Sequence, residues 1–173
     1  MKISEHFDVR ELVPKEVFDV WGYKSAQFVS DNIVNILEFT HGFFEQHFKA
    51  EDSNVDSVSI MINNWHTGGT FNWRGLRTVD YINSQIAKGI KTAKLSQHVG
   101  GSTNASDINV VLKFKGGKTL IVNSDIIYDL ILKNEAAFMT AGLTTLENKS
   151  MTKGWTHIDC RYTGLKNIYI VNP

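Results

Sequence analysis

The spacing of hydrophobic positions along the chain predicts blocks of helix separated by strands. In residues 25–48 the apolar side chains recur every three or four positions, which is typical of one long amphipathic helix. Residues 124–139 repeat this spacing behind Ser124, which is suited to an N-cap, and Gly142 is placed to end the helix. Residues 7–22 predict one or two further short helical turns.

Short alternating runs predict the strands. Residues 57–64 alternate and are rich in β-branched side chains, and residues 108–122 predict a hairpin that turns at Gly116 and Gly117. Further strands are expected at residues 143–147, 154–162 and 167–171, the last as an edge strand. We therefore predict the α+β class, with a single domain over residues 1–173 and a mainly antiparallel sheet flanked by helices.

The segment between the strand predicted at residues 57–64 and the hairpin predicted at residues 108–122 begins with a stretch that shows neither the apolar spacing of a helix nor that of a strand. Residues 63–77 are rich in Gly, Asn and aromatic side chains, which indicates a long functional loop rather than regular structure. Residues 78–91 are polar and form a possible helix.

Charge and composition exclude several classes of protein. The 18 Lys and Arg balance the 18 Asp and Glu, which disfavours a nucleic-acid partner, although residues 65–77 form a mixed basic and aromatic loop. No apolar run reaches the roughly 20 residues of a membrane span, and the first residues lack the order of a signal peptide, so we expect cytoplasmic synthesis. The single Cys160 excludes an internal disulfide and a multi-cysteine metal site.

The run WTHIDCR carries an unusual polar face. Strand alternation places four side chains on one side, namely Trp155, His157, Asp159 and Arg161. Ionisable groups on the inner face of a strand cost free energy unless they pair or bind a ligand. This pattern favours a functional site over a core, and it turns Cys160 away from that site. The other histidines, His6, His41 and His47, are expected to be structural.

Two histidines and one carboxylate are the protein ligands of many catalytic zinc sites. His98, Asp107 and His157 can supply such a set. The residue types alone do not distinguish a zinc site, because most chains contain two histidines and an aspartate.

The residues around these three positions resemble a known family. SQH, a run of small residues, NASDI and then WTHIDCR are similar to the motifs of zinc peptidases that cleave bacterial cell-wall peptides, which include D-alanyl-D-alanine carboxypeptidases and phage L-alanyl-D-glutamate endolysins. HFDVRELV resembles the family's leader, and INNWHTGGTFNWRGLR resembles a segment of its phage members. The resemblance implies the fold of the hedgehog and D-Ala-D-Ala peptidase group.

Carried over by position, the resemblance makes His98, Asp107 and His157 the ligands of Zn²⁺. Ser96 is then the motif serine that orients the first ligand loop. The family usually has seven residue steps from the first histidine to the aspartate, whereas His98 and Asp107 are nine apart. The two additional residues fall within GGSTN, where they can narrow the site.

The general base has two candidates. Many family members carry an acidic residue three positions before the second histidine, but Gly154 occupies that position here. Glu147 can lie beside His157 if the strands that contain them pair antiparallel, and phage relatives carry a glutamate at the end of this strand. Asp159 follows two residues after His157 on the same face, where it can contact the metal-bound water or orient a ligand.

Stem peptides of peptidoglycan carry free carboxylates, so a hydrolase needs a cationic group to hold them. Arg74 and Arg77 are the candidates, with His66 a weaker one, although these side chains can instead stabilise their own loop. Arg161 can serve the same purpose or pair with Asp159.

The sequence thus predicts a zinc metallopeptidase that hydrolyses peptidoglycan stem peptides, as a bacteriophage endolysin or a virion-associated lysin. Such an enzyme acts at the cell wall after release, or is carried with other virion proteins. The alternative is a non-catalytic phage structural or binding protein of the same fold, whose metal site is structural or decayed.

Overall fold

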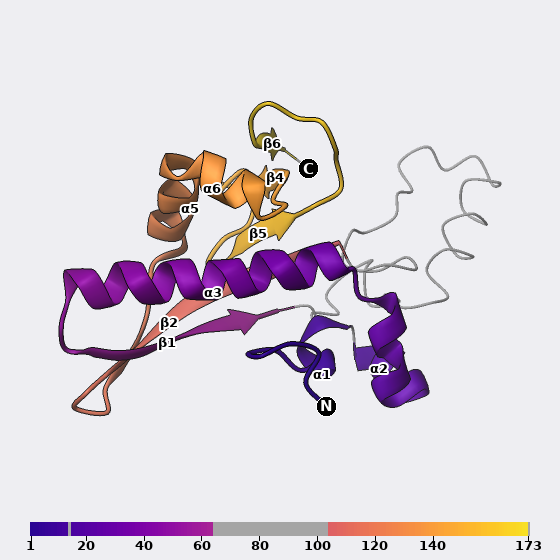
Figure 1. Cartoon of the computed structure of the whole chain (residues 1–173), viewed down its shortest axis with the longest axis horizontal. Coiled ribbons are helices and arrows are strands. Elements are labelled where there is room, and N and C mark those ends of the chain that lie inside the picture. The colour runs from indigo at the N-terminus through magenta and orange to yellow at the C-terminus, as the bar shows by residue number, and fades with distance from the viewer. Residues whose placement is uncertain (14, 64–103, 173) are drawn as a thin grey trace.

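The computed structural model describes residues 1–13, 15–63 and 104–172, which form helices packed on a mixed sheet of six strands (Figure 1). The predicted α+β class is confirmed. The predicted loop from residue 64 onward and the possible helix at 78–91 lie outside the described residues. Among the helices that are described, none combines the length and apolar character needed to cross a membrane.

Three short helices precede the main helix: α1 (Val9–Leu12), α2 (Lys15–Trp21) and the 3-10 helix η1 (Gly22–Phe28). Asp8 caps α1 by accepting a hydrogen bond from the amide of Arg10, and the Glu11 carboxylate accepts one from the amide of Asp8, which completes a capping box. One or two short helical turns were predicted for residues 7–22, and the two helices α1 and α2 agree with that prediction.

The long helix α3 (Asp31–Glu51) begins later than predicted. Residue 25 lies in η1, and the extended backbone at Val29 and Ser30 separates the two helices. The hydroxyl of Ser30 accepts a hydrogen bond from the amide of Asn32, which fixes the start of the helix. The apolar spacing correctly predicted a helix here, but the predicted helix started at residue 25, before this boundary.

The sheet has the strand order β1-β2-β5-β4-β6, with β3 paired to β2 beyond the end of β5. Its strands are β1 (Val55–Ile62), β2 (Ala105–Phe114), β3 (Thr119–Ile121), β4 (Thr145–Glu147), β5 (Thr156–Asp159) and β6 (Tyr169–Val171). Every pairing is antiparallel except that of β4 with β6, which confirms a mainly antiparallel sheet. β6 lies at the end of this order, as the sequence predicted for an edge strand.

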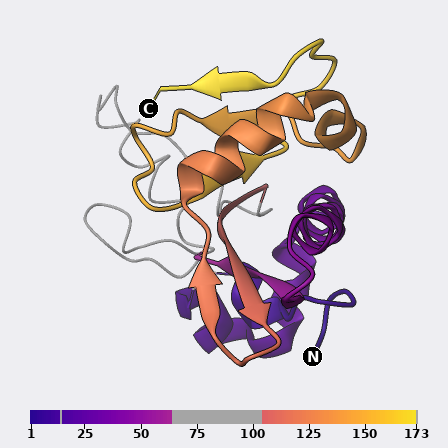
Figure 2. The same cartoon turned by 90° about the vertical axis from the view of Figure 1, so that its left-hand side faces the viewer.

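The strand β2 organises the sheet. It pairs with β1 along one edge, while on its other edge the first residues pair with β5 and the later ones with β3. The predicted hairpin turn at Gly116 and Gly117 joins β2 to β3, and Gly117 has a φ of +82°, a backbone conformation that glycine adopts readily. Figure 2 shows this hairpin at the opposite end of the molecule from β6, with α3 seen end-on beside it.

The second helical region was predicted as one helix but consists of two, α5 (Ser124–Lys133) and α6 (Glu135–Thr140). The break is at Asn134, whose backbone leaves the helical region and whose side-chain amide donates to the carbonyl of Leu130. The N-cap is also Asn123 rather than the predicted Ser124, which is the first residue of α5. Gly142, with a φ of +110°, follows α6 as predicted.

The hydrophobic core lies between one face of the sheet and the helices α3, α5 and α6. The strands contribute alternate residues to it, among them Ile108 and Val110 of β2 and Ile158 of β5. Phe138 of α6 is fully buried against the rings of Phe39 and Phe43 in α3. The opposite face carries polar side chains where β2, β5 and β4 pair, among them Asp107, His157 and Glu147.

Replacing Phe138 by alanine should destabilise the protein by about 3–5 kcal/mol, because the change leaves a cavity among aromatic rings. Urea denaturation followed by circular dichroism measures this. The control is Ile126→Ala on α5, whose side chain is 51% exposed and whose loss should change stability by less than about 0.5 kcal/mol. Equal effects of the two changes would contradict the described core.

Candidate functional site

Three neighbouring strands place a histidine and two carboxylates in one row on the polar face of the sheet. Asp107 of β2 lies directly opposite His157 of β5 in the antiparallel register. In the antiparallel pairing of β4 with β5, Thr145 lies opposite Asp159, and Leu146 lies opposite the residue before it. Glu147, the next residue of β4, therefore lies beside His157. The Glu147 Oε2 atom is 3.9 Å from His157 Nδ1, which confirms the predicted neighbourhood of these two residues.

The imidazole of His157 is held at both nitrogens. Nδ1 lies 2.8 Å from Asp107 Oδ1, and Nε2 lies 3.2 Å from Asp159 Oδ2. The side chain of His157 is only 7% exposed. A buried ring with a carboxylate on each nitrogen donates both hydrogen bonds only in its charged form.

Arg161 completes a chain of charges behind the histidine. Its Nε atom donates to Asp159 Oδ2 at 2.8 Å, and a second guanidinium nitrogen contacts the same oxygen. Of the two roles left open for Arg161, the structure thus shows the pairing with Asp159. Burial alone raises the pKa of the Asp159 carboxyl, but the hydrogen bonds from His157 and Arg161 outweigh it and lower the pKa below its ordinary value.

The same contacts set the protonation of His157. Burial lowers the pKa of the imidazole, but the hydrogen bonds to Asp107 and Asp159 outweigh it and raise the pKa from 6.5 to about 9. Without a metal, His157 is therefore an imidazolium at neutral pH. A metal ion on Nδ1 would have to displace that proton.

The two candidate bases differ in access to solvent. The side chain of Asp159 is fully buried, whereas that of Glu147 is 20% exposed. Asp159 is also engaged by both His157 and Arg161. Its place suits a group that orients the histidine, and the place of Glu147 suits a group that exchanges protons with a substrate.

The predicted ligand set is only partly described. Asp107 and His157 are brought together, whereas His98, Ser96, His66, Arg74 and Arg77 lie outside the described residues. Within residues 1–13, 15–63 and 104–172, no three His, Cys, Asp or Glu side chains are arranged to hold a metal.

The Asp107–His157 pair can be compared with the geometry of a zinc site. Imidazole and carboxylate are ligands that Zn²⁺ prefers, and two such donors on tetrahedral zinc lie roughly 3.3 Å apart. His157 Nδ1 and Asp107 Oδ1 are 2.8 Å apart, so these two atoms would fit two of the four coordination positions of zinc if they moved apart by about half an ångström.

The backbone conformation at position 154 explains why glycine, and not an acidic residue, stands three positions before His157. Gly154 has a φ of +78°, which side chains with a Cβ rarely adopt. A glutamate or aspartate here would be strained even though the space around the Cβ position is open. The turn before β5 therefore favours glycine, and an acidic group can reach His157 from β4 instead.

Asn109 is a polar residue of the same face that the sequence analysis missed. It follows Asp107 by two residues in β2, is 6% exposed, and its buried Oδ1 atom has no hydrogen-bond partner. A buried carbonyl without a partner costs about 1–3 kcal/mol. Strand alternation from Asp107 was the signal that could have identified this position.

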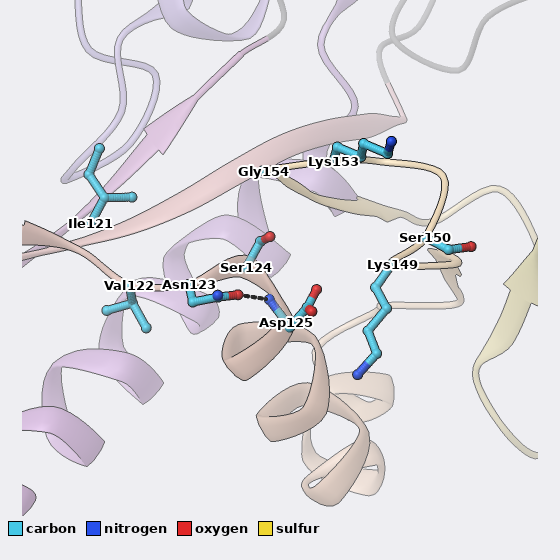
Figure 3. A pocket seen from close by; sticks show the side chains of 9 residues that line it. All are labelled: Ile121, Val122, Asn123, Ser124, Asp125, Lys149, Ser150, Lys153 and Gly154. Atoms are coloured by element: carbon cyan, nitrogen blue, oxygen red, sulfur yellow. Dashed lines mark hydrogen bonds between the residues drawn. The ribbon is translucent and has the colours of Figure 1, made fainter.

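A hollow lies on the surface near the start of α5, and its lining residues do not include Asp107, His157 or Glu147 (Figure 3). It is lined mainly by residues 121–125, 149–150 and 153–154. Two of its polar side chains are already engaged, because Asn123 accepts from the amide of Asp125 and Lys149 pairs with Asp129. We assign no function to this hollow.

The three histidines expected to be structural all have protein partners. His6 bonds to Glu38 at 2.6 Å and stacks on His41, whose Nε2 atom donates to the carbonyl of Val58. His47 lies 3.6 Å from Glu51 one turn along α3. These contacts attach the N-terminal segment to α3 and α3 to β1.

No family model, curated protein or solved structure matches the chain significantly. The arguments for a function therefore come from the residues themselves.

The stability of the metal-free protein should fall as the pH rises from about 6.5 to about 9. A histidine whose pKa is raised on folding stabilises the protein fully below its unfolded pKa, and this contribution is lost as the pH passes the folded pKa. Urea denaturation of the chelator-treated protein across this range measures the effect. The difference between wild type and His157→Gln should shrink with pH, whereas the difference between wild type and Ile126→Ala, which removes no titratable group, should stay constant. A constant difference for His157→Gln would contradict the charged ring.

Proposed function

We propose that the protein is a zinc-dependent peptidase that hydrolyses peptide bonds in peptidoglycan stem peptides, with the fold of the hedgehog and D-Ala-D-Ala peptidase group. The observation that carries this proposal is the row of Asp107, His157 and Glu147 across three strands. Two of these residues occupy ligand positions of the family that the sequence resembles. The third is an accessible carboxylate beside them.

Each residue of the row has a role in this proposal. Asp107 Oδ1 and His157 Nδ1 would hold Zn²⁺ together with His98. The bound metal supplies Lewis acidity, which polarises a carbonyl and acidifies water. Glu147 takes a proton from the attacking water and passes it to the leaving amine. Asp159 holds the Nε2 proton of His157, so that Nδ1 faces Asp107 and Glu147.

The substrate and the setting follow from the same resemblance. Arg74 and Arg77, with His66 as a weaker candidate, would bind the free carboxylates of the stem peptide. The proposed enzyme is a phage lysin, made in the cytoplasm and acting at the cell wall after release or from the virion, where other virion proteins would be its partners.

One observation favours a second function. Asp107 and His157 hydrogen bond directly to each other, so the site satisfies its own charges without a metal. With glycine at position 154, this fits a phage structural or binding protein that retains the fold but has lost catalysis. Metal analysis and digestion assays separate the two proposals.

Digestion of purified peptidoglycan by the zinc-loaded protein should release new amino groups, and a chelator should abolish this release until zinc is restored. Glu147→Gln should lower the rate about 10²–10⁴-fold, because it removes the proton acceptor but not a metal ligand. Metal analysis should find one zinc per chain in wild type and in Glu147→Gln, and a loss of zinc in Asp107→Ala.

The matched control is Asp129→Asn, which neutralises an exposed carboxylate on α5 that is not part of this row, and it should keep full activity. Bound zinc without any release of amines would favour the non-catalytic alternative. If the wild-type protein binds no zinc and releases no amines, the peptidase proposal is refuted.

A further inference from the structure

Asn109 keeps a buried carbonyl oxygen without a partner, and among the described residues only the hydroxyls of Ser4 and Thr152 share that state. Thr40, which is equally enclosed, donates to the carbonyl of Ile36, and His41 donates to the carbonyl of Val58. Nothing of this kind satisfies Asn109 Oδ1. An apolar residue of similar size would avoid the cost, so a ligand that pairs with the amide would explain its presence.

The position of Asn109 relates it to the row of Asp107, His157 and Glu147. Asn109 is two residues beyond Asp107 in β2 and shares its face of the sheet. At about 3.3–3.4 Å per residue, the two positions are roughly 7 Å apart along the strand. In the register with β1, Asn109 lies opposite Met61, and along β2 it lies two residues beyond the pairing of Asp107 with His157.

The chemistry of a primary amide narrows the ligand. It offers one carbonyl acceptor and an NH₂ donor, which are the complements of the N–H and C=O of a peptide group. An extended peptide repeats these groups every 3.3–3.6 Å or so, and about 7 Å thus spans two residues. A substrate lying along β2 with its scissile bond at the row would bring its second following peptide group to Asn109.

We propose that Asn109 binds a backbone peptide group of the substrate two residues from the scissile bond. This rests on the proposed peptidase function and deepens it, since it makes Asn109 a residue that selects substrates by length. The minimum substrate that uses it is a tetrapeptide, because a dipeptide contains only the scissile peptide group. The neutral amide adds no charge to the site, and its contribution is confined to binding.

The test compares wild type with Asn109→Leu on a stem tetrapeptide and on a dipeptide that contains the same scissile bond. For the tetrapeptide, kcat/KM should fall about 3- to 10-fold, mainly through a higher KM, since one or two hydrogen bonds are lost. For the dipeptide, kcat/KM should not change. Calorimetric titration of the metal-free proteins with the tetrapeptide should show the same weakening, and the Tm of Asn109→Leu should equal or exceed that of wild type.

Two further variants complete the design. Met61→Leu, opposite Asn109 in β1, is the matched control and should behave like wild type on both peptides. Asn109→Ala removes the amide without adding a charge near the row, so it should also weaken binding of the tetrapeptide selectively. This variant provides the test if Asn109→Leu does not fold.

The outcomes separate the two proposals. Equal losses on both peptides, or a lower Tm with no change in KM, would make Asn109 a structural residue and refute this inference, while cleavage by wild type would keep the proposed function. If wild type with zinc cleaves neither peptide nor peptidoglycan, the proposed function and the inference both fail.

Discussion

The register between β2 and β5 is the constraint on which the candidate site depends. It sets Asp107 opposite His157, and the pairing of β4 with β5 then places Glu147 beside the same ring. A slip of one residue would turn these side chains into the core. The register is secured from the other face, where Ile108, Leu146 and Ile158 are buried in the hydrophobic cluster. The apolar packing therefore fixes the geometry of the polar row.

The polar row is also a balance of buried charges. His157 lies between two carboxylates, and Arg161 compensates the outer one. Buried charges are tolerated only when they are paired and hydrogen bonded, and this chain pairs them. A proton and a metal ion would compete for the same nitrogen of His157, so occupancy by metal would depend on pH. The hydrogen bond between Asp107 and His157 in the metal-free fold is thus the contact that a metal would replace.

Alternation of side chains was sufficient to predict much of this arrangement. It placed His157 and Asp159 on one face of β5 and predicted that Glu147 would lie beside His157. Helix boundaries were harder to predict, because the apolar period continues past the cap at Ser30 and past the break at Asn134. The unpaired state of Asn109 could not be predicted, since the hydrogen bonding of a side chain depends on neighbours distant in sequence.

The separation of the two faces of the sheet has an evolutionary consequence. Helices α3, α5 and α6 pack on one face, while Asp107, Asn109 and His157 lie on the other. Substitutions on the polar face leave the apolar packing of the other face in place. A lineage could therefore lose, regain or exchange the chemistry of this face under selection while its scaffold persisted.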